Sequence, residues 1–291
     1  MLTHHQTAFL GPSEGFCDLE TARVVVVPFG YEGGVSYGRG TALAPLEVLK
    51  ASQQVEFYDE VLEKEPYRIG IATLAEPEIP QAPQQMHSLL LNISAEILDR
   101  GQFPIVVGGD HSISTGIVRA IAQRYPSFGV IQLDAHADLR DTYLGSPFSH
   151  ACIMSRVLEL TPCTLQIGIR SMSAGEARRV KQQSLALCTM HQWRQGSFDF
   201  KSALTALPKQ IYVTLDVDVF DWSVVSSTGT PEPGGMLWDE MLELLGLVFS
   251  EKEVVGCDIV ELSHNKDDMN SPFAVAKLIY KMIGFKFTAQ L

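Results

Sequence analysis

The sequence lacks a long apolar run, a cluster of basic residues and a secretory leader. No stretch approaches the roughly 18 apolar residues that a membrane-spanning helix requires. Residues 1–10 lack the basic start and the continuous apolar core of a signal peptide. The 22 Lys and Arg residues are outnumbered by 34 Asp and Glu residues, which gives a formal net charge of −12. We therefore expect a cytoplasmic protein that binds neither nucleic acid nor membrane, and the acidic balance permits a cationic partner.

Cysteine is scarce and irregularly placed. The five cysteines are odd in number and widely spaced, and no two form a CxxC pair. This pattern predicts neither a disulfide framework nor a zinc ribbon, so buried, reduced thiols are expected. Linkers, internal repeats and low-complexity tracts are absent, and 46% of the residues are hydrophobic. The composition predicts one globular domain over residues 1–291 with a sizeable core.

Apolar, β-branched runs alternate with segments of helical spacing along almost the whole chain. Because these runs are continuously apolar, they indicate strands that are buried on both faces, as in parallel sheets. The pattern predicts an α/β fold, a three-layer αβα sandwich with a mostly parallel central sheet of about eight strands. Loops are expected at 30–40 and 226–235. The expected strands are 22–28, 69–72, 103–107, 128–133, 164–169, 185–190, 210–215 and 253–261, and the expected helices are 84–100, 112–124, 174–183, 238–250 and 271–285.

Side chains that can bind metal ions follow three of the expected strands. Residues i, i+2 and i+4 of an extended chain share one face, so Asp134, His136 and Asp138 are expected to converge. The same holds for Asp216 and Asp218. Because the carboxyl ends of parallel strands open at one edge of the sheet, the motifs should meet there. The motifs are Asp-Ala-His-Ala-Asp at 134–138, Asp-Val-Asp at 216–218 and Gly-Gly-Asp-His at 108–111, which adds the imidazole of His111.

The donor set is rich in oxygen and nitrogen and contains no sulfur. This favours a hard or borderline divalent cation such as Mn²⁺ over a structural zinc. Four carboxylates exceed what one ion needs, whereas two ions about 3.5 to 4 Å apart, bridged by carboxylates, would use them all. Taken singly, each motif also fits a plainer role. Asp110 can orient His111 or cap a helix at Ser112, and His111 can be an ordinary histidine at a helix start.

Three motifs, in this order, resemble the signatures of the ureohydrolase family, which contains arginases, agmatinases and related guanidino-hydrolases. They are GGDHS at 108–112, DAHAD at 134–138 and DVDVFD at 216–221. The resemblance extends to YGRGTALAP at 37–45, TGTPEPGG at 228–235 and DIVEL at 258–262. It implies an arginase-like fold and two Mn²⁺ ions per subunit. By this resemblance His111, Asp134, Asp138 and Asp216 would bind one ion, and Asp134, His136, Asp216 and Asp218 the other.

The resemblance also implies roles for residues outside the metal motifs. His150 matches the proton-shuttling histidine of the family, and Glu261 matches the carboxylate that pairs with the substrate guanidinium. Thr230 lies in the matching TGTP loop, and Asp138 is expected to accept a hydrogen bond from a metal-bridging hydroxide. By residue type alone, His150 is equally compatible with a helix start and Glu261 with an ordinary strand-end acid. Residues 263–264 read Ser-His where many relatives have Asn-Pro, which places the surroundings of the site in question.

The motifs look most like those of agmatinases, which implies hydrolysis of agmatine, a small cationic guanidino substrate, to putrescine and urea in polyamine biosynthesis. Arginases have an asparagine two residues beyond DxHxD, where this chain has Arg140. Residues 139–141 are therefore expected to govern substrate choice. Because Arg140 can also bind a carboxylate, guanidinobutyrate, arginine and formimidoyl-glutamate stay open as substrates. A metal-binding regulator without turnover and a single-zinc deacetylase are the rival classes. Relatives form trimers or hexamers, so the resemblance predicts a homo-oligomer.

Overall fold

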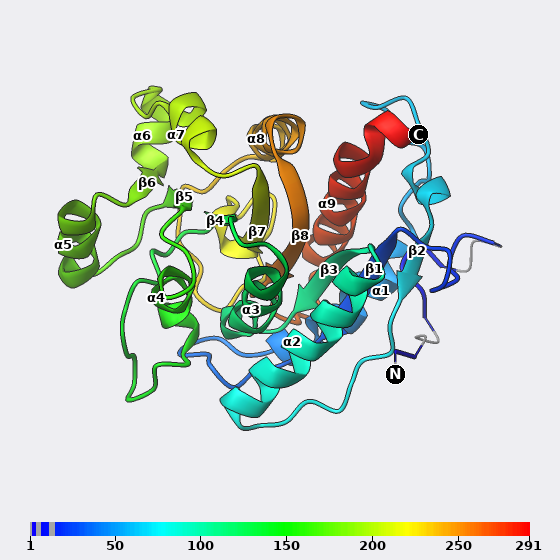
Figure 1. The fold of residues 1–291 in the computed structure, drawn as a ribbon, viewed down its shortest axis with the longest axis horizontal. Helices are drawn as coiled ribbons and strands as arrows, with labels where there is room; N and C mark the ends of the chain where they lie inside the picture. Colours follow the sequence, from blue (N-terminus) through cyan, green and yellow to red (C-terminus); the bar gives the residue numbers. More distant parts are fainter. Residues whose placement is uncertain (1, 4–6, 12–14) are drawn as a thin grey trace.

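The computed structural model describes residues 2–3, 7–11 and 15–291, and a sheet of eight strands forms its centre (Figure 1). The strand order is β2-β1-β3-β8-β7-β4-β5-β6, and every pairing between these neighbours is parallel. The predicted α/β fold with a parallel sheet of this size is confirmed. The strands are β1 (Val24–Phe29), β2 (Ile71–Thr73), β3 (Phe103–Gly108), β4 (Gly129–Leu133), β5 (Thr164–Ile169), β6 (Ala186–Thr189), β7 (Gln210–Asp216) and β8 (Glu253–Val260).

Both faces of the sheet are covered, as the continuous apolar runs predicted. In β1, Val24 and Val26 belong to one hydrophobic cluster, whereas Val25 and Val27 belong to another. Since successive side chains of a strand point to opposite faces, the sheet is the middle of three layers (Figure 1). The first cluster includes side chains of α1 (Ala44–Ser52), α8 (Trp238–Glu251) and α9 (Asn270–Phe287), and the second includes those of α2 (Pro83–Asp99), α3 (Ser114–Arg124) and α4 (Ile153–Leu158).

The longer helices agree with the predicted ranges, and several short ones were not predicted. The bounds of α5 (Ala174–Gln183) are those expected, because Ser173 and Glu176 form a capping box at its start. The strand expected over 185–190 ends early, since Thr189 caps a new helix. The unpredicted helices, α1, α4, α6 (Met190–Gln195) and α7 (Phe200–Ala206), have only six to nine residues, too few for a repeated apolar spacing to be recognised.

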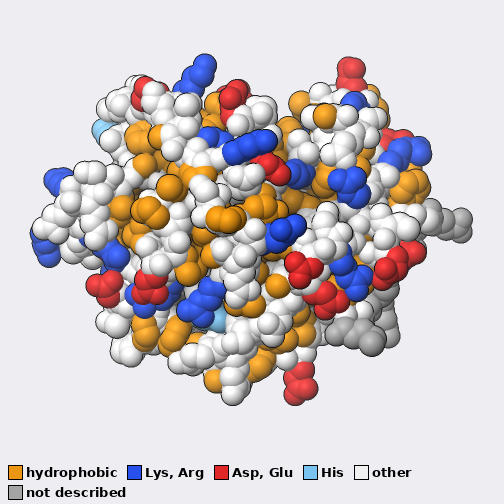
Figure 2. Space-filling view, in the orientation of Figure 1, with side chains coloured by type: hydrophobic (Ala, Val, Ile, Leu, Met, Phe, Trp, Pro, Cys, Tyr) orange, Lys and Arg blue, Asp and Glu red, His pale blue; other side chains and the backbone are white. Residues whose placement is uncertain are grey.

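The surface and the cysteines agree with most of the compositional expectations. Within the described ranges, no helix combines the length and apolarity needed to cross a membrane. Acidic and basic side chains are interspersed on the face shown in Figure 2. All five cysteines are free thiols, but Cys17 and Cys163 are partly exposed rather than buried. Residues 1–10 were expected not to form a signal peptide. Residues 1 and 4–6 of this segment lie outside the described residues.

The sheet order brings four polar segments together. β3, β8, β7 and β4 are consecutive neighbours in the middle of the sheet. Because they are parallel, their carboxyl ends lie at one edge, where α/β sheets bind ligands. His111 follows β3, Glu261 follows β8, Asp216 ends β7 and Asp134 follows β4.

Candidate metal centre and catalytic site

A buried cluster of carboxylates and imidazoles lies at this edge of the sheet. His111 is fully buried, and its Nδ1 atom lies 3.1 Å from Asp134 Oδ2. The same nitrogen lies 3.4 Å from Asp138 Oδ2 and 3.4 Å from Asp216 Oδ2. Carboxylates that follow β4 and end β7 therefore converge on one imidazole nitrogen supplied by the segment after β3.

A second imidazole joins the same cluster. His136 Nδ1 lies 2.8 Å from Asp218 Oδ2 and 3.6 Å from Asp134 Oδ1. The structure thus brings all six predicted ligands together, with Asp134 between the two imidazoles. Two groups have ligand atoms within 4.8 Å of one another and could each hold an ion: His111, Asp134 and Asp216, and Asp134, His136 and Asp218.

The chemistry of the cluster fits divalent cations. It offers carboxylate oxygens and imidazole nitrogens, and no sulfur is among its donors. His111 Nδ1 and Asp218 Oδ2 are fully buried, and the groups nearest to them are other members of the cluster, at 3.1 and 2.8 Å. Burial and neighbouring carboxylates raise the pKa of Asp216 and raise that of Asp138 to about 6. Crowded carboxylates are ionised together only when positive charge lies between them, and two divalent cations would supply that charge.

The ligand motifs reach the cluster through turns rather than along extended strands. β4 ends just before its motif, and Asp138 adopts a left-handed backbone conformation with φ 51°. Asp134 Oδ1 accepts the backbone N–H of His136 at 2.5 Å, which bends the segment. After β7, a 3-10 helix over Val217–Val219 carries Asp218. The expectation that strand alternation aligns these side chains was therefore wrong, although their convergence was predicted correctly.

A chain of buried hydrogen bonds orients His111. The Nε2 atom lies 2.8 Å from Thr214 Oγ1 in β7, and Thr214 donates to Asp258 Oδ1 in β8 at 2.6 Å. Tyr212 donates to the other oxygen of Asp258 at 2.5 Å. Because Thr214 gives its only proton to Asp258, it accepts the Nε2–H of His111, and the Nδ1 lone pair faces the carboxylates. None of the three metal motifs indicated Thr214 or Tyr212.

Thr214→Val is expected to weaken the binding of divalent metal by about 10- to 100-fold. The substitution keeps the shape of the side chain but removes the oxygen that accepts from His111 Nε2, so the ring loses its fixed tautomer and orientation. Titration calorimetry with Mn²⁺ measures the difference. Thr214→Ser retains the hydroxyl group and should retain the affinity. Equal losses in the two variants would assign the effect to packing rather than to the hydrogen bond.

His150 and Glu261 form a pair beside the cluster. His150 begins a 3-10 helix, and its Nδ1 atom lies 3.2 Å from Glu261 Oε1. The same oxygen accepts the backbone N–H of His111 at 2.8 Å. Glu261 is buried and, like Asp138, has a left-handed backbone, with φ 64°. Burial disfavours the imidazolium, but the Glu261 carboxylate outweighs it and raises the pKa of His150 to about 9, which favours the protonated ring.

One cavity of about 240 Å³ connects the cluster with Thr230 and Arg140, two of the three residues predicted to bind substrate; the third, Glu261, is buried behind His150 and is not among the lining residues. Its lining includes Asp138 and Asp216 of the cluster, His150, Thr230 and Arg140. The Arg140 guanidinium is partly exposed, lies 4.7 Å from the Tyr143 ring centroid and places Nε 3.7 Å from Glu176 Oε2. Carboxylates, an imidazole, a hydroxyl group and a guanidinium therefore line one concave space, which is the usual form of a binding site.

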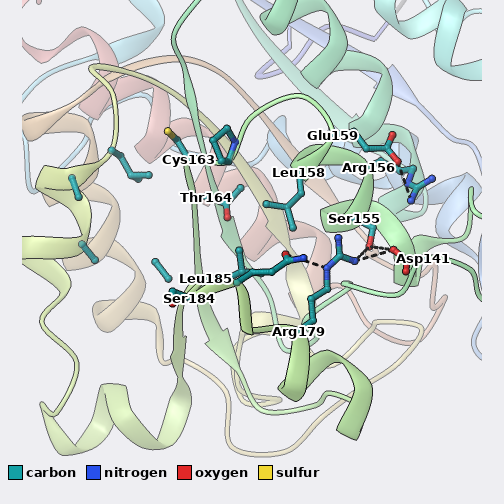
Figure 3. A pocket seen from close by; sticks show the side chains of 16 residues that line it. Asp141, Ser155, Arg156, Leu158, Glu159, Cys163, Thr164, Arg179, Ser184 and Leu185 are labelled. Carbon is teal, nitrogen blue, oxygen red and sulfur yellow. Dashed lines mark hydrogen bonds and ion pairs between the residues drawn. The ribbon is translucent and has the colours of Figure 1, made fainter. Parts of the chain in front are cut away.

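A larger cavity, of about 560 Å³, lies apart from this cluster and shows what holds the segment after the DAHAD motif (Figure 3). Arg179 of α5 points toward Asp141 and Ser155, and its Nη1 atom donates to Asp141 Oδ1 at 3.0 Å. The same nitrogen donates to the carbonyl of Leu139 at 2.8 Å. Asp141 therefore lines this second cavity, and of residues 139–141 only Arg140 lines the cavity at the cluster. Arg140 is therefore the residue of this segment that a substrate in the smaller cavity could contact, and the role of residues 139–141 in substrate choice stays a prediction.

Arg170, directly after β5, supports the cluster from a position that no motif indicated. Its Nη2 atom donates to the carbonyl of Asp218 at 2.6 Å and to that of Glu232 at 2.8 Å. It thereby joins the turn that carries Asp218 to the loop 226–235, which carries Thr230. In the sequence, a single arginine after a strand is indistinguishable from a surface cation.

Comparison with known proteins agrees with this geometry. The model of the Arginase family matches residues 22–284. The chain is 38% identical to the N(1)-aminopropylagmatine ureohydrolase of Synechocystis sp., over 94% of this chain and 92% of that protein. It is 30% identical to the agmatinase of Pyrococcus horikoshii, over 92% of this chain and 93% of that protein. The crystal structure of agmatine ureohydrolase of Thermoplasma volcanium is similar, with a TM-score of 0.89 and 26% sequence identity. The match covers 98% of this chain and 96% of that one. The chain therefore belongs to the arginase family, the ureohydrolases, and is a hydrolase.

Proposed function

We propose that this chain hydrolyses the guanidinium group of agmatine to urea and putrescine, with two Mn²⁺ ions in the buried cluster. The observation that carries the proposal is the His150–Glu261 pair, which is joined to the backbone of His111. A protein that only binds metal needs no such pair. Hydrolysis of a resonance-stabilised guanidinium needs both a partner for its charge and a proton donor. The proposed metal ligands are His111, Asp134, His136, Asp138, Asp216 and Asp218.

The metal ligands are proposed to divide between two positions. When bound, two divalent cations lower the pKa of a water molecule from near 15.7 towards about 7 and so supply a nucleophile at neutral pH. Asp134, which belongs to both ligand groups, supports a bridging role, and we propose the same role for Asp216. Asp138 lines the cavity and is proposed to orient the attacking oxygen by accepting a hydrogen bond from it.

Glu261 is proposed to bind the substrate guanidinium. Its contacts with His111 N and His150 Nδ1 both use Oε1, which leaves Oε2 for an N–H group of the substrate. Charge-assisted hydrogen bonds of this kind are about twice as strong as neutral ones. Thr230, on the cavity wall, is proposed as a further polar contact.

His150 is proposed to protonate the departing amine. Cleavage of the C–N bond leaves an amine nitrogen that must gain a proton. Glu261 holds His150 Nδ1, so the proton is proposed to come from Nε2 of the imidazolium, whose ring lines the cavity. The Glu261 carboxylate favours this proton, since it raises the pKa of His150 above the usual value of an imidazole. His150 begins a 3-10 helix, and this position is compatible with the proposed role as a proton donor as well as with a purely structural role at a helix start.

Arg140→Gln is expected to lower KM for agmatine about two- to fivefold, because the variant removes a like charge from a partly exposed wall of the cavity. KM for guanidinobutyrate should rise by a similar factor, since Arg140 can pair with its carboxylate. Steady-state urea release on both substrates measures the change. A rise in KM for agmatine would contradict the proposed repulsion between the Arg140 guanidinium and the cationic substrate.

N(1)-aminopropylagmatine is a second candidate substrate. Relatives that carry this name are 38% and 35% identical to the chain, compared with 30% for the agmatinase of P. horikoshii. The molecule presents the same guanidinium to Glu261 and adds a longer cationic tail.

A urea-release assay with added Mn²⁺ tests the proposal and separates the substrates. Agmatine, N(1)-aminopropylagmatine, arginine and guanidinobutyrate are compared by kcat/KM, and agmatine is expected to be highest. A higher value for N(1)-aminopropylagmatine would favour the second candidate, and comparable turnover of arginine would contradict the agmatine assignment. No urea from any of the four would show that the proposed activity is wrong.

We also propose that residues 1–291 form one domain and that the protein is a cytoplasmic trimer or hexamer. The continuous eight-stranded sheet supports the proposal of one domain. The family resemblance supports the proposal of a cytoplasmic trimer or hexamer. Light scattering coupled to size-exclusion chromatography measures the assembly.

A further inference from the structure

The glycine-rich loop 30–40 fastens three parts of the site to one another. Gly34 N donates to Asp110 Oδ2 at 2.6 Å, and Asp110 in turn caps the turn that begins at His111. His150 N donates to the carbonyl of Gly34 at 3.4 Å. Farther along the loop, the backbone of Gly40 accepts from His264 N at 3.0 Å, just after β8. The loop therefore contacts the segments that carry His111, His150 and Glu261.

Two glycines allow the loop to lie this close. A Cβ atom on Gly34 would lie 3.0 Å from Asp110 Oδ1 and 3.1 Å from His150 N. A Cβ atom on Gly38 would lie 2.6 Å from the Cα atom of Gly229, next to Thr230. The contact at Gly38 leaves no room for a side chain, and the one at Gly34 is tighter than most, so the loop is packed closely against the site.

Ser36, between these two glycines, extends a side chain to His150. Its hydroxyl oxygen lies 2.9 Å from His150 Nε2, while His150 Nδ1 faces Glu261 Oε1 at 3.2 Å. Ser36 itself is exposed, and both residues line the cavity of about 240 Å³. We propose that Ser36 is a positioning residue of the reaction, which holds the His150 ring with Nδ1 toward Glu261 by binding its other nitrogen.

The geometry explains why one bond at Glu261 is insufficient. An imidazole held at a single nitrogen can still tilt and rotate about its bond to Cβ, whereas bonds at both nitrogens fix the plane of the ring. A proton donor must lie within hydrogen-bond reach of the atom that receives its proton. Misplacement of a catalytic group by about 1 Å can cost on the order of 100-fold in rate. Ser36 therefore acts on catalysis through the position of His150.

This inference rests on the proposed hydrolysis, and kinetics of four variants test it. Ser36→Ala should lower kcat for urea release on the order of 10- to 100-fold with KM within about twofold, metal content unchanged and melting temperature unchanged. Ser36→Thr keeps the hydroxyl on an exposed position and should recover most of kcat. Ser149→Ala is the matched control: it removes a hydroxyl that donates to the carbonyl of Gly34 at 3.3 Å, without touching the imidazole, and should keep kcat. Ser36→Gly, which also lacks the hydroxyl, should behave like Ser36→Ala.

A second measurement does not depend on turnover. Diethyl pyrocarbonate attacks only the neutral ring, so the modification of His150 is followed at a series of pH values by peptide mass mapping. At each pH the rate should be several-fold higher in Ser36→Ala, because Nε2 loses its partner. Wild-type kcat in Ser36→Ala, equal defects in Ser36→Ala and Ser36→Thr, or an unchanged modification rate would each overturn the role of Ser36. If the wild-type protein releases no urea from any guanidino compound, the proposed function fails instead, and the modification rate still tests the Ser36–His150 bond.

Discussion

Replacement of Glu261 by glutamine is expected to lower kcat/KM for urea release by on the order of 10³-fold while both metal ions stay bound. Loss of one partner of a buried, hydrogen-bonded charge pair between two binding partners typically costs about 2–5 kcal/mol of their interaction, and each 1.4 kcal/mol is about tenfold in rate. The amide oxygen of glutamine can still accept the backbone N–H of His111, which Glu261 accepts at 2.8 Å. The metal ligands are therefore retained, whereas the negative charge opposite both the guanidinium and the His150 imidazolium is lost. Steady-state kinetics and metal analysis on the same preparation measure both effects.

Glu251→Gln is a matched control for this experiment. Glu251 is an exposed acid at the end of α8, so the same chemical change there should alter neither kinetics nor metal content. Loss of metal together with activity in Glu261→Gln would mean that Glu261 supports the cluster rather than the substrate.

His111→Ala is expected to lower metal content from two ions to about one or fewer per chain and to abolish measurable turnover. Its Nδ1 atom is the point on which Asp134, Asp138 and Asp216 converge. Without that nitrogen, the first of the two ligand groups lacks its neutral donor. Three carboxylates then face one another around a site that binds a cation less well. Metal analysis after dialysis and calorimetric titration with Mn²⁺ measure the change.

The control for His111→Ala is His191→Ala, which changes an exposed histidine at the start of α6. It should leave two ions bound at wild-type affinity. Two ions bound with unchanged affinity in His111→Ala would remove His111 from the ligand set. If Glu261→Gln lost metal and His111→Ala kept it, the proposed division between substrate binding and metal binding would be reversed.

The strands of this fold were predictable because their signal is local. All eight apolar runs became strands, since a segment buried on both faces is apolar at every position, and that property is visible in a short window. The order of the strands is a different matter. No local pattern states that β3, β8, β7 and β4 are neighbours, although this order is what brings His111, Glu261, Asp216 and Asp134 to one place.

The candidate site was predictable where its residues occur in dense motifs. Asp134, His136 and Asp138 stand within five residues, so their joint role was visible, even though the backbone that aligns them proved to be a turn. Thr214 and Ser36 are common residue types, and they reach their histidines across 103 and 114 positions of sequence. Contacts between residues so far apart in sequence depend on the tertiary fold, and they cannot be predicted from residue type.

The left-handed backbone at Asp138 and Glu261 has a consequence for how this chain can evolve. At φ 51° and 64°, each non-glycine residue destabilises the native state by about 1–3 kcal/mol, and glycine adopts such angles without that cost. Each carboxylate is thus kept at a cost in backbone strain, which at Glu261 is offset by its buried contacts with His111 N and His150 Nδ1. In a lineage that stopped using this cavity the reason to bear that strain would be lost, so glycine or asparagine at these two places in a distant descendant would indicate that the chemistry was no longer under selection.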